Sequence, residues 1–132
     1  MIEFSVPVRV KKSKNKWFVL NMNEYRNAHH RTLANAKKDY HHLVPIDLIR
    51  QQTHNTLIIN PIRVHYRYYP NSARLYDRMN IASVLDKFLM DVLVKEEIIK
   101  DDNYKLVLFP TFEHGGIEKE ARMDVSIEVM PR

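Results

Sequence analysis

The stretch Tyr76 to Tyr104 reads YDRMNIASVLDKFLMDVLVKEEIIKDDNY, and the rest of the chain is organised around it. At about 100° per residue, its apolar residues recur with the i, i+3, i+4, i+7 spacing of one helix face. Such a stripe is typical of a helix that packs against a core. The stripe consists of Ile81, Val84, Leu85, Phe88, Leu89 and Val92. We therefore expect an amphipathic helix here whose apolar face is structural.

The polar residues beside this stripe divide between two flanks of the predicted helix. Asn80, Lys87 and Asp91 share one row, because they stand at positions i, i+7 and i+11. Asp86 points to the opposite flank. These flanking residues, rather than the apolar stripe, are the candidates for function.

Acidic residues stand at both ends of the same helix. Asp77 precedes its start, and Asp101 and Asp102 follow its end. A hard cation such as Mg²⁺ takes oxygen ligands, so carboxylates brought together by a helix that folds back on a sheet would suit it. The same residues also fit a structural interpretation, in which Asp77 or Asn80 is an N-cap. In that interpretation Asp101-Asp102-Asn103 is an ordinary turn.

Several motifs recur in order along this stretch. They are Asp77-x-x-Asn80, then Val84-x-Asp86-Lys87-Phe88-x-x-Asp91-x-Leu93, then Ile99-x-Asp101-Asp102. Together they resemble the core signature of the RusA family of Holliday-junction resolvases, which is D-x-D-N, a helix carrying a lysine, and a later D-D pair. Members of that family are small homodimeric Mg²⁺-dependent endonucleases, common in phages and prophages.

This resemblance implies an enzyme that cuts four-way DNA junctions by phosphodiester hydrolysis in recombination or repair. It implies Mg²⁺ as the cofactor, with Mn²⁺ as an alternative, no small-molecule cofactor, branched DNA as the partner and a homodimer as the assembly. In such chemistry Mg²⁺ activates a water and stabilises charge in the transition state. The implied catalytic residues are Asp77, Lys87 and Asp102, the implied metal ligands are Asp77, Asp102 and Asp101, and the site-supporting residues are Asn80, Asp86 and Asp91.

One position departs from the family pattern. Met79 stands where the pattern has its second Asp, and a thioether is a poor ligand for Mg²⁺. Asp86, or Asp101 alongside Asp102, would supply the missing ligand. Of these, Asp86 is disfavoured because it points about 100° away from Lys87. Met79 also favours a second interpretation, a catalytically weakened or inactive RusA-like protein that binds branched DNA or a recombination partner.

A lysine-rich segment follows the first predicted strand. Lys11, Lys12, Lys14 and Lys16 lead into Trp17 and Phe18. Lysines contact phosphates and aromatic rings stack on bases or sugars, so this segment suits nucleic acid. The alternative is a solvated basic loop with Trp17 and Phe18 turned into the core.

Residues from Asn23 to Tyr40 have the spacing of a helix, with Asn23 as its N-cap. Its exposed side is basic, which beside a basic loop favours a surface that follows a phosphate backbone. The expected DNA-binding residues are Lys11, Lys12, Lys14, Lys16, Arg26, Arg31 and Arg74. The pairs His29-His30 and His41-His42 suit metal binding poorly, because neighbours on a helix point about 100° apart.

Four segments rich in β-branched and aromatic residues are predicted strands. They are 1–10, interrupted near Pro7; 56–69, broken at Asn60-Pro61; 104–112; and 122–130, with Gly115-Gly116 in the last connection. In the second of them Arg63, His65 and Arg67 alternate with apolar residues, so one face presents cations. The predicted order is β-α-β-α-β-β, an α+β sandwich with helices packed on a small mixed or antiparallel sheet.

Composition limits the number of domains, the kind of partner and the class of chemistry that we expect. The chain has 132 residues, 45% of them hydrophobic, which suits one domain over residues 1–132. Its 21 Lys and Arg against 16 Asp and Glu leave a net charge of +5, which suits a polyanionic partner. The absence of Cys, of G-x-S-x-G and of a Gly-rich phosphate loop argues against a nucleophilic enzyme. No apolar run approaches the ~18 residues of a membrane span and no signal peptide opens the chain, so we expect a cytoplasmic protein. The resemblance to the RusA family implies that it is encoded by a phage or prophage and acts in a bacterial host cell.

Overall fold

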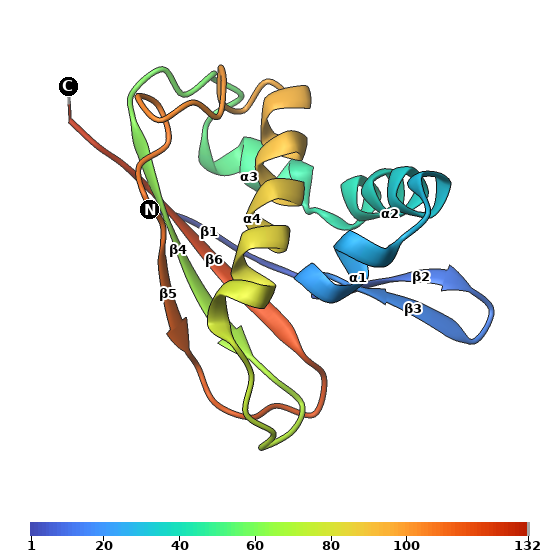
Figure 1. The fold of residues 1–132 in the computed structure, drawn as a ribbon. Helices are drawn as coiled ribbons and strands as arrows, with labels where there is room; N and C mark the ends of the chain where they lie inside the picture. The colour runs from blue at the N-terminus through green and yellow to red at the C-terminus, as the bar shows by residue number, and fades with distance from the viewer. Residues whose placement is uncertain (132) are drawn as a thin grey trace.

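A four-stranded sheet forms the centre of the protein, and one long helix crosses a face of it. The computed structural model describes residues 1–131 and confirms the predicted α+β class (Figure 1). The strands are β1 (Ile2–Val6), β2 (Arg9–Ser13), β3 (Lys16–Val19), β4 (Ile62–Tyr69), β5 (Thr111–His114) and β6 (Arg122–Val129). The helices are α1 (Met22–Asn27), α2 (His30–Leu43), α3 (Ile46–Gln52) and α4 (Arg78–Lys95).

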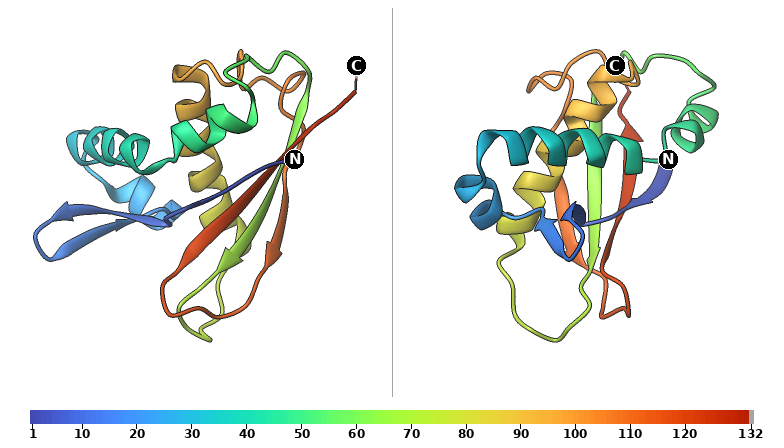
Figure 2. Two further views of the ribbon diagram at one scale, coloured as in Figure 1. Left: turned by 180° about the vertical axis from the view of Figure 1, so that it is seen from behind. Right: turned by 90° about the vertical axis from the view of Figure 1, so that its right-hand side faces the viewer.

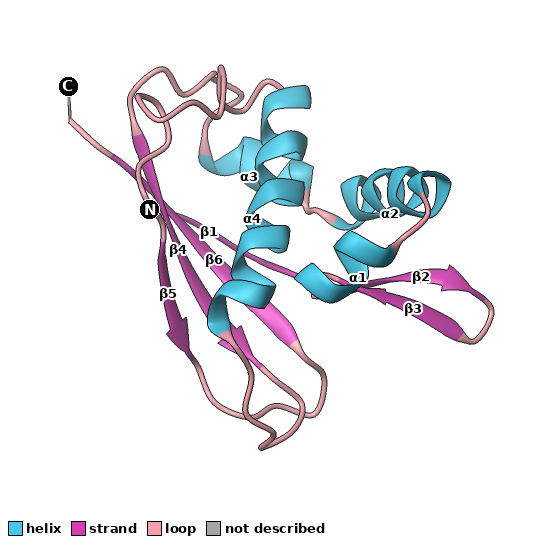
Figure 3. Ribbon diagram, viewed as in Figure 1, coloured by secondary structure: helices cyan, strands magenta, loops and turns pink. Residues whose placement is uncertain are grey.

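The sheet has the strand order β1-β6-β4-β5. β4 pairs antiparallel with β6 and parallel with β5, so the sheet is mixed. Side chains alternate between the two faces of a strand, and in β4 the residues Ile62, Val64, Tyr66 and Tyr68 are buried. The helices all lie on this buried side, which leaves the other face of the sheet open (Figure 3).

The predicted amphipathic helix is α4, and its apolar stripe is confirmed. All six predicted stripe residues are buried, and Ala82, Met90 and Leu93 are buried with them. The buried surface is wider than the stripe because α4 contacts α1 and α2, and it also bonds to the sheet through Asp86 and Tyr66. The helix ends at Lys95, after which Glu97 takes a positive φ of 57°. Burial of each large stripe residue stabilises the fold by about 1.5–3 kcal/mol.

The lysine-rich segment is a β-hairpin, not a loop. β2 and β3 form a separate two-stranded sheet. The hairpin projects to one side of the main sheet together with α2 (Figures 1 and 2). Its inner face carries the buried Val10 and Phe18, and the Phe18 ring stacks on Phe88 of α4 at 6.2 Å between centroids. Trp17 lies on the outer face and keeps 37% of its surface exposed, so the two aromatic residues have opposite environments.

The predicted helix 23–40 is wrong in its start and in its continuity. The structure has two helices, with α1 capped by Asn21 rather than Asn23, because the Asn21 side chain accepts a hydrogen bond from the Glu24 N–H. His29 then adopts an extended conformation, and its Nδ1 accepts from the Arg31 N–H. The chain therefore breaks at a histidine that caps the second helix.

Two strand predictions are also wrong in extent. β4 begins only at Ile62, after Pro61, which has no N–H to donate to a ladder. The segment 104–112 is mostly not a strand, since Asn103 accepts hydrogen bonds from the N–H groups of Lys105 and Leu106 and holds a turn there. Regular pairing starts at Thr111 and lasts four residues.

The free edge of β1 is occupied by a side chain. The Gln52 carboxamide accepts from the Glu3 N–H at 2.8 Å and donates to the Glu3 carbonyl at 2.9 Å. Both backbone groups would otherwise be available to another strand. The side chain of α3 thus fills the place of a neighbouring strand at this point.

Candidate functional site

Asp77, the first residue of the motif, is the N-cap of α4. Its carboxylate accepts a hydrogen bond from the Met79 N–H at 3.0 Å, which confirms the structural interpretation of this residue. Asp77 is exposed, and Met79 keeps 47% of its surface exposed on the first turn of the helix. At this position a negative charge also stabilises the positive end of the helix dipole.

A hollow of about 590 Å³ opens beside this end of α4. Arg74, Asp77 and Asn80 line it, together with residues from the start of α1 and the loop after β4. The Asn80 side-chain oxygen accepts from the Met22 N–H at 2.9 Å, so this amide joins α4 to α1. The first half of the motif therefore lies at a real concavity, although two of its members also hold the backbone together.

Asp86 lies between α4 and the sheet, where Tyr66 of β4 donates a hydrogen bond to its carboxylate. Burial raises the pKa of Asp86 above its ordinary value, and the negative charge of Asp102 raises it further. The Tyr66 hydrogen bond opposes this shift. Burial likewise raises the pKa of Tyr66, so its hydroxyl stays protonated as a donor. The sequence predicts Asp86 as a site-supporting residue and disfavours it as a metal ligand on its helical angle, but it gives no sign of the Tyr66 partner.

The charge of Asp102 acts on Lys87 as well as on Asp86. Hydrogen bonding to Tyr25 is the largest cause that raises the pKa of Lys87, followed by the charge of Tyr25. Asp91 and Asp102 raise it further as nearby negative charges. The ammonium group lies 5.3 Å from the centre of the Tyr25 ring. The loop after α4 thus brings Asp102 near the middle of the helix, where its charge raises the pKa of Asp86 and of Lys87.

Asp101 forms the turn that the structural interpretation predicted. Its carboxylate accepts from the Asp102 N–H at 2.8 Å and from the Asn103 side-chain amide at 3.2 Å. The backbone bond from Asp102 is the main cause that lowers the pKa of Asp101. Each carboxylate oxygen of Asp101 therefore accepts one hydrogen bond within the turn.

The motif is thus spread along α4 rather than gathered at one point. Nine residues separate Asp77 from Asp86, which is about 14 Å along a helix axis. Residues 1–131 contain no group of three or more His, Asp or Glu side chains placed to hold a metal ion, so Asp77, Asp101 and Asp102 do not form one there. Binding of Mg²⁺ through fewer carboxylates stays a prediction, since this ion keeps several waters and commonly uses one or two.

The predicted DNA-binding lysines and arginines are all exposed. We call the β2–β3 hairpin with α1 and α2 the basic arm; its expected DNA-binding residues are Lys11, Lys12, Lys14, Lys16, Arg26 and Arg31. Among residues 1–131 one ion pair involves an arm lysine, between Lys12 and Glu24 at 3.9 Å. Arg74, also exposed, lies apart from the arm at the hollow beside α4. The arm therefore presents mostly uncompensated positive charge.

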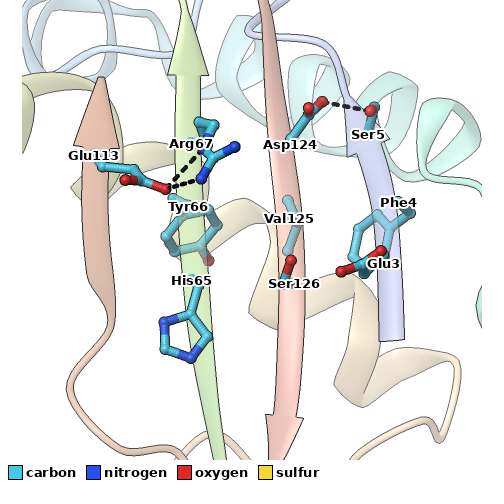
Figure 4. Close-up of a pocket in the computed structure, with 10 residues that line it drawn as sticks. All are labelled: Glu3, Phe4, Ser5, His65, Tyr66, Arg67, Glu113, Asp124, Val125 and Ser126. Atoms are coloured by element: carbon cyan, nitrogen blue, oxygen red, sulfur yellow. Dashed lines mark hydrogen bonds and ion pairs between the residues drawn. The ribbon is translucent and has the colours of Figure 1, made fainter. Parts of the chain in front are cut away.

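The open face of the sheet carries the predicted row of cations, but acids accompany them. Arg67 pairs with Glu113 of β5 at 2.6 Å, and His65 contacts Glu128 of β6 at 2.9 Å. A hollow of about 470 Å³ lies on this face. Figure 4 shows residues that line it, with Arg67 and Glu113 on one side and Asp124 bonded to Ser5 on the other. This face is nearly balanced in charge.

A second cluster joins the helices at the far end of α4. Glu96 accepts from His41 Nε2 at 2.7 Å and pairs with Arg50 at 2.5 Å, which connects α2, α3 and the end of α4. Hydrogen bonding to His41 is the largest cause that lowers the pKa of Glu96. His41 was noted in the sequence only as part of a histidine pair, and here it has a structural partner 55 residues away.

No protein-family model matches this chain, and no match was found among curated proteins. Within residues 1–131, every helix is too short or too polar to cross a membrane.

Proposed function

We propose that the protein binds branched DNA through its basic arm, as its resemblance to RusA-type resolvases implies. The observation that carries this proposal is the arm itself, in which the hairpin and α2 contact each other and both expose cations. Neutralising phosphates with Lys and Arg releases counterions, which is the main sequence-independent source of DNA affinity. Such a protein would act in the cytoplasm of a bacterial host.

Lys87 extends this positive surface toward the body of the protein. It is exposed on α4, and its contact with Tyr25 places it beside α1, which also carries Arg26. A homodimer is part of the proposal, because the basic arms of two protomers can then each bind one branch of the DNA junction. Two-fold symmetric dimers are also the commonest assembly of soluble proteins.

The proposal is tested by measuring the affinity of a fluorescein-labelled four-way junction at several salt concentrations. Log affinity should fall linearly with log salt, and the slope should flatten by about 0.9 for each phosphate contact removed. A variant with Lys11, Lys12, Lys14 and Lys16 all changed to Gln should show this flattening. The matched control changes the same number of exposed lysines outside the arm, at Lys95, Lys100, Lys105 and Lys119.

The control variant loses the same net charge as the hairpin variant. Comparing the two therefore distinguishes binding at the basic arm from a general electrostatic attraction between the whole protein and DNA. Equal weakening by the two variants would show that the arm has no special role. A junction affinity that does not change with salt would remove the proposal altogether. Light scattering on the same samples reports whether the protein is a dimer.

A second candidate function is Mg²⁺-dependent cleavage of the junction. It is favoured by one observation: the negative charge of Asp102 raises the pKa of both Asp86 and Lys87, so Asp102 lies near each of them. Asp86 and Asp102 would hold the metal, and Lys87 would offer its ammonium group to a substrate phosphate. When bound, Mg²⁺ would polarise the phosphate and lower the pKa of a water molecule.

Cleavage is measured with an end-labelled junction in Mg²⁺ and in Mn²⁺. We expect Asp102→Asn to abolish cleavage while junction affinity is unchanged or improved, since a negative charge near phosphates is removed. Asp77→Asn and Asp77→Ala separate two roles, because Asn caps a helix as well as Asp does and Ala does not. If Asp77→Asn cuts normally and Asp77→Ala is merely less stable, Asp77 is a cap and not a metal ligand. If wild type binds the junction and never cuts it, only the binding function stands.

A further inference from the structure

Trp17 lies on the outer face of the β2–β3 hairpin between two cations. The Arg9 guanidinium carbon lies 3.9 Å from the centre of the indole ring, and the Lys11 ammonium lies 5.2 Å from it. Lys11 is the direct cross-strand partner of Trp17, and Arg9 lies two residues along the same face of β2. The outer face of the hairpin is therefore an aromatic ring flanked by positive charge.

This ring is not needed to attach the hairpin to the protein. The inner face, through Val10 and Phe18, makes that attachment, and both residues are at most 1% exposed. Trp17 keeps 37% of its surface exposed. A large aromatic residue on the solvent side of a projecting, lysine-rich hairpin is available to a partner.

The chemistry of this face suits an unpaired base. Bases stack on aromatic side chains and on planar guanidinium groups, and the adjacent lysines hold the phosphates of the same strand. In a duplex the bases are stacked on each other and present only their edges in the grooves. Lys12, Lys14 and Lys16 surround the tip of the hairpin and are exposed. Phosphate contacts and a stacking surface are thus combined on one short element.

We propose that the outer face of the β2–β3 hairpin, formed by Arg9, Lys11 and Trp17, is a stacking site for an unpaired DNA base. This inference rests on the proposed function, in which branched DNA is the partner. It specifies that the hairpin binds an unpaired base of that DNA. The lysines bind the phosphates of the DNA backbone, and the Trp17 ring stacks on a base that is no longer paired.

The chain offers a direct test, because Trp17 is its one tryptophan. Intrinsic fluorescence is titrated with a single-stranded dT oligomer of about ten nucleotides, a length within the range that single-strand sites cover. The same length of abasic backbone and a blunt duplex are titrated in parallel, and anisotropy of labelled copies reports binding of each. The dT strand should quench Trp17, whereas the abasic strand should bind through its phosphates without quenching.

Substitutions give a second measurement that does not rely on Trp17 fluorescence. Trp17→Ala should weaken dT binding roughly five- to 150-fold, the usual effect of losing one stacked base. Abasic-strand affinity should not change. Trp17→Phe keeps a ring and should retain most of the dT affinity. Circular dichroism and thermal melting show that each variant is folded.

The outcomes separate this inference from the proposed function. Quenching by the abasic strand equal to that by dT, or equal losses of affinity for both strands in Trp17→Ala, overturns the stacking site. Salt-dependent junction binding without any quenching by dT also overturns it and leaves the proposed function intact. Quenching by dT together with no preference for the junction over duplex supports the stacking site and counts against the proposed function.

Discussion

The basic arm and the open face of the sheet carry the same kind of sequence pattern and present very different surfaces. On β2 and on β4, cations alternate with apolar residues, as in Arg9 and Lys11 or His65 and Arg67. On the sheet, Glu113 and Glu128 from neighbouring strands pair with the cations, whereas the arm has the single Lys12–Glu24 pair among its described lysines. A row of cations therefore predicts an anion-binding surface only when the neighbouring strands are known.

The largest effect is expected where the arm joins the body. Phe88 of α4 contacts Phe18 of the hairpin and Tyr40 of α2, with ring centroids 6.2 and 5.7 Å apart. Because Phe88 is 2% exposed, Phe88→Ala should lower the free energy of unfolding by roughly 3–5 kcal/mol. Urea unfolding measures this loss, with Leu75→Ala, at a 96% exposed position, as the control. A loss below about 1 kcal/mol would mean that the arm is attached elsewhere.

The next effect concerns DNA affinity and contrasts the two surfaces directly. Changing the four hairpin lysines to Gln should weaken junction binding roughly 100-fold or more at low salt, because each lost phosphate contact reduces counterion release. Arg67→Gln on the sheet should leave affinity within about twofold, since that charge is already paired with Glu113. Comparable losses from both changes would place DNA on the sheet face as well. Fluorescence anisotropy with one labelled junction measures all of these variants.

A third effect depends on pH and on the cluster that attaches α2 to the end of α4. The pKa of Glu96 is lowered in the folded protein, so its contribution is present above the unfolded value of about 4.3. That contribution is lost as the pH falls through the lower folded-state pKa. Wild type should exceed Glu96→Gln in stability above about pH 5, and the difference should shrink in acid. Melting curves between about pH 3 and 7 measure it, and a difference that grew on acidification would contradict this assignment.

The smallest effect is expected from the exposed pair on the open sheet face. Arg67 and Glu113 are both more than half exposed at their side chains, so solvent screens their attraction. Removing either residue alone, or both together, should leave the melting temperature unchanged within error. A measurable coupling in the double-mutant cycle would show that the balanced charge on this face is structural.

Local patterns allowed much of this fold to be predicted. The stripe on α4 and the alternation in β4 depend on residues close together in the sequence, and both predictions were correct. The end of helix α1 was missed because a histidine, His29, supplies the next cap. The segment around Asn103 has strand-like composition, but its side chain holds a turn that composition does not reveal.

The candidate site was harder to predict because its contacts are distant in the sequence. Asp77 and Asp101 were placed correctly as a cap and a turn by the structural interpretation. Asp86 bonds to Tyr66, which is 20 residues away in the sequence. Asp102 comes near the middle of α4 through an irregular loop, and hydrophobic periodicity does not predict the path of such a loop. The acids that balance Arg67 and His65 come from β5 and β6, so their pairing depends on strand register.

The Gln52 side chain that occupies the β1 edge limits how copies of this protein can join. With the outward groups of Glu3 already bonded, a second copy meets no open ladder at that point and cannot easily continue the sheet there. A dimer would then join through side-chain surfaces or at the other edge, formed by β5. In the folded protein the same contact leaves less of the β1 edge open to pairing with the strands of neighbouring molecules, which is the usual route to edge-to-edge aggregation.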